Sequence, residues 1–219
     1  MVLRKSIPLL LLCLLINSRS AAAQSSGDLA QQGLEAYRAG EYESAAAIWQ
    51  QMIDIDPQNS DAYNNLGATL YQLGQLNDAA NAYRQAIEID GESADTYNNL
   101  GTVLASQEKY EEAIAAYEQA IELDSALPET YVNLGNLLPA EQAVGAYAKA
   151  IELNPDYVQA HNNLGVVLFE LERYEEAAFA YSRALEIDPE FQSARENLAL
   201  VEAVMEASES SDTDVVDDN

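Results

Sequence analysis

The sequence is poor in the residues that most often carry catalysis or hold metal ions. Its 219 residues include one cysteine, Cys13, and one histidine, His161. Neither a nucleophile elbow nor a glycine-rich phosphate loop occurs along the chain. Two acidic stretches, 54–61 and 212–218, lack the glycine and the distal glutamate of a calcium loop. We therefore predict a protein that is not an enzyme and has no catalytic residue, cofactor or metal site.

Basic residues are also scarce. Ten Lys and Arg residues face 37 Asp and Glu residues, which gives a formal net charge of −27. Nucleic acid would be repelled by such a chain, so we expect no nucleic-acid partner. Another protein or peptide that carries basic side chains is the expected partner, because opposite charges attract. The alternative is that the acidity only keeps the protein soluble.

Long apolar runs are absent except near the N-terminus. The apolar stretch 7–16 follows Arg4 and Lys5 and precedes the small residues of 21–23, in the order typical of a secretory signal peptide. Ten residues are too few to cross a bilayer, which takes about 20, although an uncleaved anchor remains the alternative. We predict a signal peptide over 1–23 and an exported protein without a stable membrane anchor. It would be periplasmic or secreted, with the thylakoid lumen as the alternative in a photosynthetic cell.

A repeated phrase organises the rest of the chain. Five glycines follow one another at intervals of 34, 34, 34 and 30 residues, namely Gly33, Gly67, Gly101, Gly135 and Gly165. Downstream of each glycine stands an alanine, at Ala45, Ala79, Ala113, Ala143 and Ala177. An aromatic residue follows four positions later, at Trp49, Tyr83, Tyr117, Tyr147 and Tyr181. Apolar residues at steps of three and four form one stripe on a helix, so each unit is expected to be helical.

These positions resemble the tetratricopeptide repeat, in which an aromatic, Leu-Gly, Ala, an aromatic, Ala and a late Pro recur over 34 residues. The resemblance implies an all-α, right-handed superhelical solenoid of about five helix-turn-helix repeats. We expect it over 24–207, with a C-terminal capping helix at 190–207 and a disordered acidic tail at 208–219. His161 stands in the slot that tyrosine holds in other units, which favours a packing role over a chemical one.

The fourth unit is four residues shorter than the others between Gly135 and Ala143. Four residues are close to one helical turn, so the apolar stripe would keep its phase. The spacing predicts a first helix that ends near Leu138, about one turn early, with Pro139 opening the next helix. Such a deletion could leave a notch on one edge of the repeat array. The alternative is a neutral deletion in a turn.

The resemblance also implies a concave groove, and the residue two positions before the later repeat glycines would face it. That position holds Asn65, Asn99, Asn133 and Asn163. Side-chain amides both donate and accept hydrogen bonds, so this ladder could pair with the backbone of an extended peptide. The alternative is that these asparagines serve helix packing. Other candidates for the groove are Asn64, Tyr71, Asn98, Thr102, Asn136, Asn162, Val166 and Phe169.

Acidic residues precede three of the ladder positions by four residues, at Asp61, Asp95 and Glu129. They argue against the family's binding mode in which Lys and Arg clamp a carboxylate, and they suit a basic ligand. The predicted function is a protein–protein interaction scaffold or assembly factor that binds an extended, basic protein segment in its groove. The alternative is a structural adaptor that self-associates as a homo-oligomer through its ends or convex face.

Overall fold

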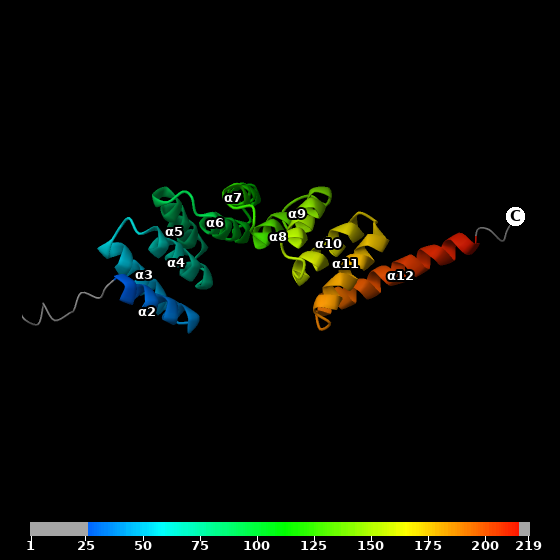
Figure 1. Ribbon diagram of the computed structural model, residues 1–219, viewed down its shortest axis with the longest axis horizontal. Coiled ribbons are helices and arrows are strands. Elements are labelled where there is room, and N and C mark those ends of the chain that lie inside the picture. Colours follow the sequence, from blue (N-terminus) through cyan, green and yellow to red (C-terminus); the bar gives the residue numbers. More distant parts are fainter. Residues whose placement is uncertain (1–25, 215–219) are drawn as a thin grey trace, which may run out of the picture. The chain divides into compact units, whose positions relative to one another are not determined.

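The computed structural model describes residues 26–214, and the predicted signal peptide lies outside this range. Within it the chain forms 11 α-helices and no strand (Figure 1). The all-α prediction, with five helix pairs and one further C-terminal helix, is confirmed. No helix in the described part is both long enough and apolar enough to cross a membrane.

The described residues divide into two compact units, with the boundary between Ile89 and Asp90. The single solenoid predicted over 24–207 is therefore described one unit at a time. The first unit contains α2 (Ser26–Arg38), α3 (Tyr42–Ile55), α4 (Ser60–Gln72) and α5 (Leu76–Ile89). The second contains α6 (Ala94–Ser106), α7 (Tyr110–Leu123), α8 (Pro128–Gly135), α9 (Ala140–Leu153), α10 (Val158–Glu170), α11 (Tyr174–Ile187) and α12 (Gln192–Asp214).

One helix departs from an otherwise regular pattern. Each second helix has 14 residues and each first helix has 13, except α8, which has eight. The predicted shortening is confirmed, but α8 ends at Gly135 and not near Leu138. The residue before a proline is disfavoured in the helical region, so Pro139 prevents Leu138 from continuing α8. Pro139 itself is the N-cap of α9, one position before the helix that it was predicted to open.

The repeat glycines let each helix pair close around an aromatic ring. A Cβ placed on any of the five would lie only 2.6–2.8 Å from a ring atom of the second helix of the same pair. The rings belong to Trp49, Tyr83, Tyr117, Tyr147 and Tyr181, which are all buried. Glycine and aromatic residue are therefore one packing unit, which explains why they recur together.

The first pair uses a variant of this packing. Trp49 is 1% exposed, and its indole N–H donates to Thr69 Oγ1 on α4 at 3.1 Å. The Thr69 hydroxyl in turn donates to the backbone oxygen of Asn65 at 2.7 Å. A buried indole N–H needs such a hydrogen-bond partner, whereas the tyrosines of the other pairs have no N–H group in their side chains. The position of Thr69 within its repeat is held by valine in two other repeats, at Val103 and Val167.

Several acidic residues have a structural role in the links between repeats. After each second helix one side-chain oxygen accepts the backbone N–H two residues later, at 2.9–3.2 Å. The five residues are Asp56, Asp90, Asp124, Asn154 and Asp188. This hydrogen bond defines an Asx turn, which reverses the chain without a backbone hydrogen-bond ladder. Four of the acidic residues of the chain therefore have a structural role in these turns.

The turns inside four of the pairs contain a residue with positive φ, and in two of them this residue is a strained glutamate. Gly40 and Gly74 adopt φ of 77° and 72°, and the equivalent positions in later repeats hold Glu108 and Glu172 at φ of 60° and 59°. The left-handed conformation costs a residue with a Cβ about 1–2 kcal/mol. Glycine avoids this cost but loses about 0.5–1 kcal/mol through its greater freedom in the unfolded chain.

We expect Glu108→Gly to stabilise the second unit by about 0.5–1 kcal/mol, the difference between these two effects. Urea unfolding followed by circular dichroism measures the change. The matched control is Glu118→Gly in the interior of α7, where the same substitution should destabilise by about 1 kcal/mol. Equal destabilisation by both variants would contradict the assignment of strain to Glu108.

The last helix is longer than predicted. α12 continues to Asp214, beyond the expected end of the cap at Ala207, so the predicted disordered tail is helical over 208–214. No glycine or proline follows Gln192 to interrupt the helix, which accounts for its continuation. Figure 1 shows α12 extending beyond the end of α11, against which its first part packs. Ala194 and Val201 are buried there, as a capping role requires.

Candidate functional site

The predicted acidic residues lie at the beginnings of first helices. Asp61, Asp95 and Glu129 are exposed in the first turns of α4, α6 and α8. In the second unit the structure brings two of them together, because Asp95 and Glu129 line one pocket of about 240 Å³ with Asn98, Leu127, Pro128 and Thr130. Asp61 belongs to the first unit and is not part of this pocket.

The floor of this pocket is held by amide hydrogen bonds between repeats. Asn98 Oδ1 on α6 accepts from Asn133 Nδ2 at 3.2 Å and from Thr130 Oγ1 at 3.1 Å, both on α8. Thr130 is 1% exposed and Asn133 is half-buried. One predicted ladder residue, Asn133, therefore ties its repeat to the preceding one.

A second set of amides runs in one direction from α12 through α10 to the residue that follows α8. Asn197 Nδ2 on α12 donates to Asn162 Oδ1 on α10 at 3.2 Å, and Asn162 Nδ2 donates to Asn163 Oδ1 at 3.2 Å. Asn163 Nδ2 then donates to Asn136 Oδ1 after α8 at 3.0 Å. The Tyr147 hydroxyl on α9 donates to the same Asn136 oxygen at 2.8 Å. These side chains hold the repeats together, and their use by a ligand stays a prediction.

The remaining predicted residues are distributed over both units. Asn64, Asn65 and Tyr71 are half-buried on α4, and Asn99 is half-buried on α6. The side chain of Asn99 makes no hydrogen bond to another described residue, so a ligand could pair with this amide without breaking a contact. Phe169 is half-buried and packs on Tyr174, with ring centroids 5.4 Å apart, so its ring belongs mainly to the core.

The deletion leaves a notch next to the shortened helix. This pocket of about 300 Å³ lies between the end of α8, the start of α9 and α10. Its polar lining is Asn136, Tyr147, Asn163 and Glu170, and its apolar lining is Gly135, Leu138, Ala140, Val166 and Val167. The sequence predicted the notch as one of two outcomes but did not predict Glu170 as a site residue. The signal was present, since the equivalent position holds Arg38, Gln72 and Ser106 in other repeats.

Burial affects the tyrosine that lines the notch and a second tyrosine close to Glu170 in the same way. Burial raises the pKa of the Tyr147 phenol to about 12, against a smaller lowering by its amide neighbour Asn163 and a smaller further rise from the Glu170 carboxylate. Burial likewise raises the pKa of Tyr181 to about 12, with the Glu170 charge as the second cause. Both phenols are therefore neutral at physiological pH, and among the described residues that line the notch Glu170 alone carries a formal charge.

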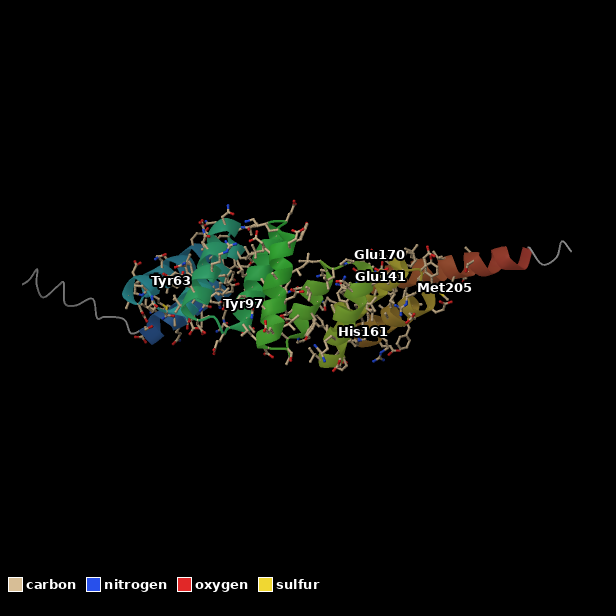
Figure 2. All side chains as sticks on the ribbon, turned by 90° about the horizontal axis from the view of Figure 1, so that it is seen from above. Tyr63, Tyr97, Glu141, His161, Glu170 and Met205 are labelled. Carbon is tan, nitrogen blue, oxygen red and sulfur yellow. The ribbon has the colours of Figure 1, made fainter. Side chains whose placement is uncertain are left out.

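A third pocket is mostly apolar and lies along another face of α10. It measures about 420 Å³ and is lined by Ala148, Ile151, His161, Leu164, Leu168, Glu175, Glu176, Phe179 and Ala180. His161 is 7% exposed, and its Nε2 lies 2.9 Å from the backbone oxygen of Pro155, in keeping with the predicted packing role. Figure 2 shows His161 and Glu170 at opposite edges of the second unit. No group of metal-ligating side chains occurs among residues 26–214.

We define the first-helix face as the surface of α6, α8 and α10 that carries Asp95, Asn98, Glu129, Asn163 and Glu170. Carboxylates, amides and apolar side chains line the two pockets on this face. Such a surface can accept hydrogen bonds and attract cations, which is the chemistry of peptide recognition.

Comparison with known families identifies the repeats. A family model described as TPR repeat matches residues 33–74, 67–108, 101–138 and 140–172, and a tetratricopeptide repeat model matches 158–191. The chain belongs to the tetratricopeptide repeat family. The gap between the third and fourth matches falls at Pro139, the site of the deletion. A search of curated proteins finds no match.

Several solved structures share the fold of this tetratricopeptide repeat protein. A crystal structure of MamA is 25% identical and superposes with a TM-score of 0.67 over 72% of this chain and 94% of MamA. YrrB, described as a TPR protein with an unusual peptide-binding site, is 22% identical, with a TM-score of 0.66 over 83% of this chain and 95% of YrrB. PilF of Pseudomonas aeruginosa is 23% identical, with a TM-score of 0.68 over 80% of this chain and 88% of PilF. The last two show the fold alone.

Proposed function

We propose that this protein is a non-catalytic scaffold that binds an extended, basic segment of another protein on its first-helix face. The observation that carries the proposal is the pocket in which Asp95 and Glu129 lie together on the surface. YrrB, which shares the fold, is described as having a peptide-binding site, and this description supports a peptide as the kind of ligand but not its charge. The signal-peptide pattern of residues 1–23 supports the proposal that the protein is exported and functions outside the cytoplasm. N-terminal sequencing of the native protein tests whether this segment is removed.

The geometry assigns each pocket residue a part in this binding. The two carboxylates are exposed, so a Lys or Arg side chain can approach them without crossing a barrier. Leu127 and Pro128 offer apolar contact to the stem of such a side chain. Asn98 accepts two hydrogen bonds within the fold and thereby keeps α6 and α8 in register beneath the ligand.

The test is fluorescence anisotropy with a labelled peptide of four Lys-Gly-Ser repeats. We expect binding that weakens as salt rises, because exposed charges are screened over about 8 Å at physiological ionic strength. Asp95→Asn with Glu129→Gln should weaken binding about two- to thirtyfold, since each exposed ion pair contributes about 0.2–1 kcal/mol. A peptide of Glu-Gly-Ser repeats should not bind.

The matched control removes the same charge elsewhere. Glu118→Gln with Glu122→Gln changes two exposed acids of α7, outside the pocket, and should leave the affinity nearly unchanged. If both double variants lose affinity equally, the peptide responds only to net charge, and the proposed site is wrong. If the lysine peptide does not bind at all, the basic-ligand proposal is wrong.

Self-association is the second candidate, and one observation favours it. Phe179 is 69% exposed at the edge of the apolar pocket, at a position that holds small or polar residues in the other repeats: Ala47, Asn81, Ala115 and Gly145. Leu200 on α12 is 54% exposed. Light scattering on the samples used for anisotropy separates the candidates. A monomeric mass supports the scaffold, and a mass that rises with concentration supports a homo-oligomer.

A further inference from the structure

The notch combines three features that suit one basic side chain: an apolar wall, hydrogen-bond acceptor atoms and the side-chain carboxylate of Glu170. The wall consists of Leu138, Ala140, Val166 and Val167, together with the backbone at Gly135. Lys and Arg side chains bury an aliphatic stem and keep their charged head at a polar end, so such a lining suits them. A volume of about 300 Å³ is at the lower limit of ligand pockets, which fits one side chain better than a folded partner.

Two oxygens inside the notch can each accept a hydrogen bond from a ligand. The Tyr147 hydroxyl donates its single O–H hydrogen bond to Asn136 Oδ1, so toward a ligand it can only accept a hydrogen bond. Asn163 Oδ1 accepts from Asn162 and retains a second lone pair. A Lys ammonium or an Arg guanidinium has donors only and no acceptor, so it complements these oxygens.

Glu170 carries a charge that no Lys or Arg of residues 26–214 neutralises in an ion pair. Other glutamates of this region pair with arginines three residues before them, as Glu176 does with Arg173 and Glu186 with Arg183. Within the described residues no Lys or Arg lies within ion-pair distance of Glu170. An acid that lines a pocket and lacks a cationic partner among the described residues can take its counter-ion from a ligand.

We propose that the notch is an anchor pocket for a single Lys or Arg side chain of a bound protein, with Glu170 as the counter-ion of its cationic head. The inference deepens the proposed function, on which its biological meaning rests, by naming a second recognition point on the first-helix face. It also gives the deletion a function. In the other repeats the first helix continues beyond the repeat glycine, whereas α8 ends at its repeat glycine, Gly135. The space that this missing helical segment would fill is available to the ligand.

The test uses acetylated, amidated tripeptides, Gly-Lys-Gly and Gly-Arg-Gly, with Gly-Gln-Gly as the neutral control. The side-chain amide signals of Asn136 and Asn163 are followed by NMR titration of the labelled protein. We expect both cationic tripeptides to shift these signals, with dissociation constants of about 1 mM, and the neutral tripeptide to leave them unchanged. The tighter of the two identifies whether the pocket prefers an ammonium or a guanidinium.

Two variants assign the effect to Glu170. Glu170→Gln should weaken tripeptide binding about fivefold, the upper range for an ion pair that solvent reaches. Glu172→Gln removes the same charge two residues away, outside the notch lining, and should change the affinity little. Because Glu170 is exposed, its substitution should leave the melting temperature unchanged. Equal loss in both variants, equal binding of the neutral tripeptide, or no shift at Asn136 and Asn163 would each overturn the inference.

The tripeptide result is independent of the proposed function. If the tripeptides bind in the notch but the longer lysine peptide ignores Asp95 and Glu129, the proposed scaffold site fails and the notch stands. If the longer peptide depends on Asp95 and Glu129 but the tripeptides do not shift the notch signals, the scaffold stands and the anchor pocket fails.

Discussion

Trp49→Ala is expected to destabilise the first unit by about 3–5 kcal/mol, the usual range for removing a buried tryptophan. The ring is 1% exposed, fills the space above Gly33 and donates to Thr69, so the substitution removes packing and one buried hydrogen bond together. Urea unfolding followed by circular dichroism measures the loss, because the chain contains no other tryptophan to report by fluorescence. The loss should be confined to the first unit, since Trp49 packs in the cluster of Leu29, Ala45, Met52, Ile53 and Ala62.

Trp49→Tyr is the matched control that the chain itself provides. Four other repeats hold a tyrosine at this position, so the ring should fit and the loss should be clearly smaller than for alanine. Amide hydrogen exchange should then show faster exchange in α2, α3 and α4 for Trp49→Ala, with little change in α9 to α11. An alanine variant as stable as the wild type would show that the first pair does not depend on its ring.

Gly101→Ala is expected to destabilise the second unit by up to about 2 kcal/mol, although alanine is the better helix former. The new Cβ would lie 2.6 Å from Tyr117 Cε1, closer than real Cβ contacts come. Tyr117 is 2% exposed and its hydroxyl lies 3.3 Å from Thr102 Oγ1, so the ring cannot move aside without loss. Overpacking of this kind typically costs about 1–3 kcal/mol and exceeds the helix-propensity gain of about 1 kcal/mol only when the clash is severe.

Gly145→Ala separates these two effects. Gly145 also lies inside a helix, α9, but a Cβ placed there meets no atom within 4 Å. With no clash, only the propensity gain of up to about 1 kcal/mol remains, and we expect the variant to be more stable than the wild type. The midpoints of urea unfolding should therefore move in opposite directions for the two variants. A rise for Gly101→Ala as well would show that the helix pair has room to open.

The repeat pattern by itself determined the helices and their pairing. Glycine, alanine and the aromatic residue recur at fixed offsets because each set makes its contacts within one helix pair, so the contacts are local in sequence. The deletion after Gly135 predicted the short first helix for the same reason. Its end was predicted at Leu138, three residues too late, because the chain already leaves the helix through turns in which Leu137 N–H donates to Leu134 O and Leu138 N–H donates to Gly135 O.

Only the tertiary structure decided what the asparagines and glutamates contact. Asn133 reaches Asn98 over 35 residues and Asn197 reaches Asn162 over 35, so these bonds depend on how one helix pair packs on the next. A repeat period places the amides on one side but does not give the separation of neighbouring helices, and an amide bonds a neighbour or a ligand equally well. The same holds for Glu170, whose place in the notch follows from the space that the shortened α8 leaves beside α10.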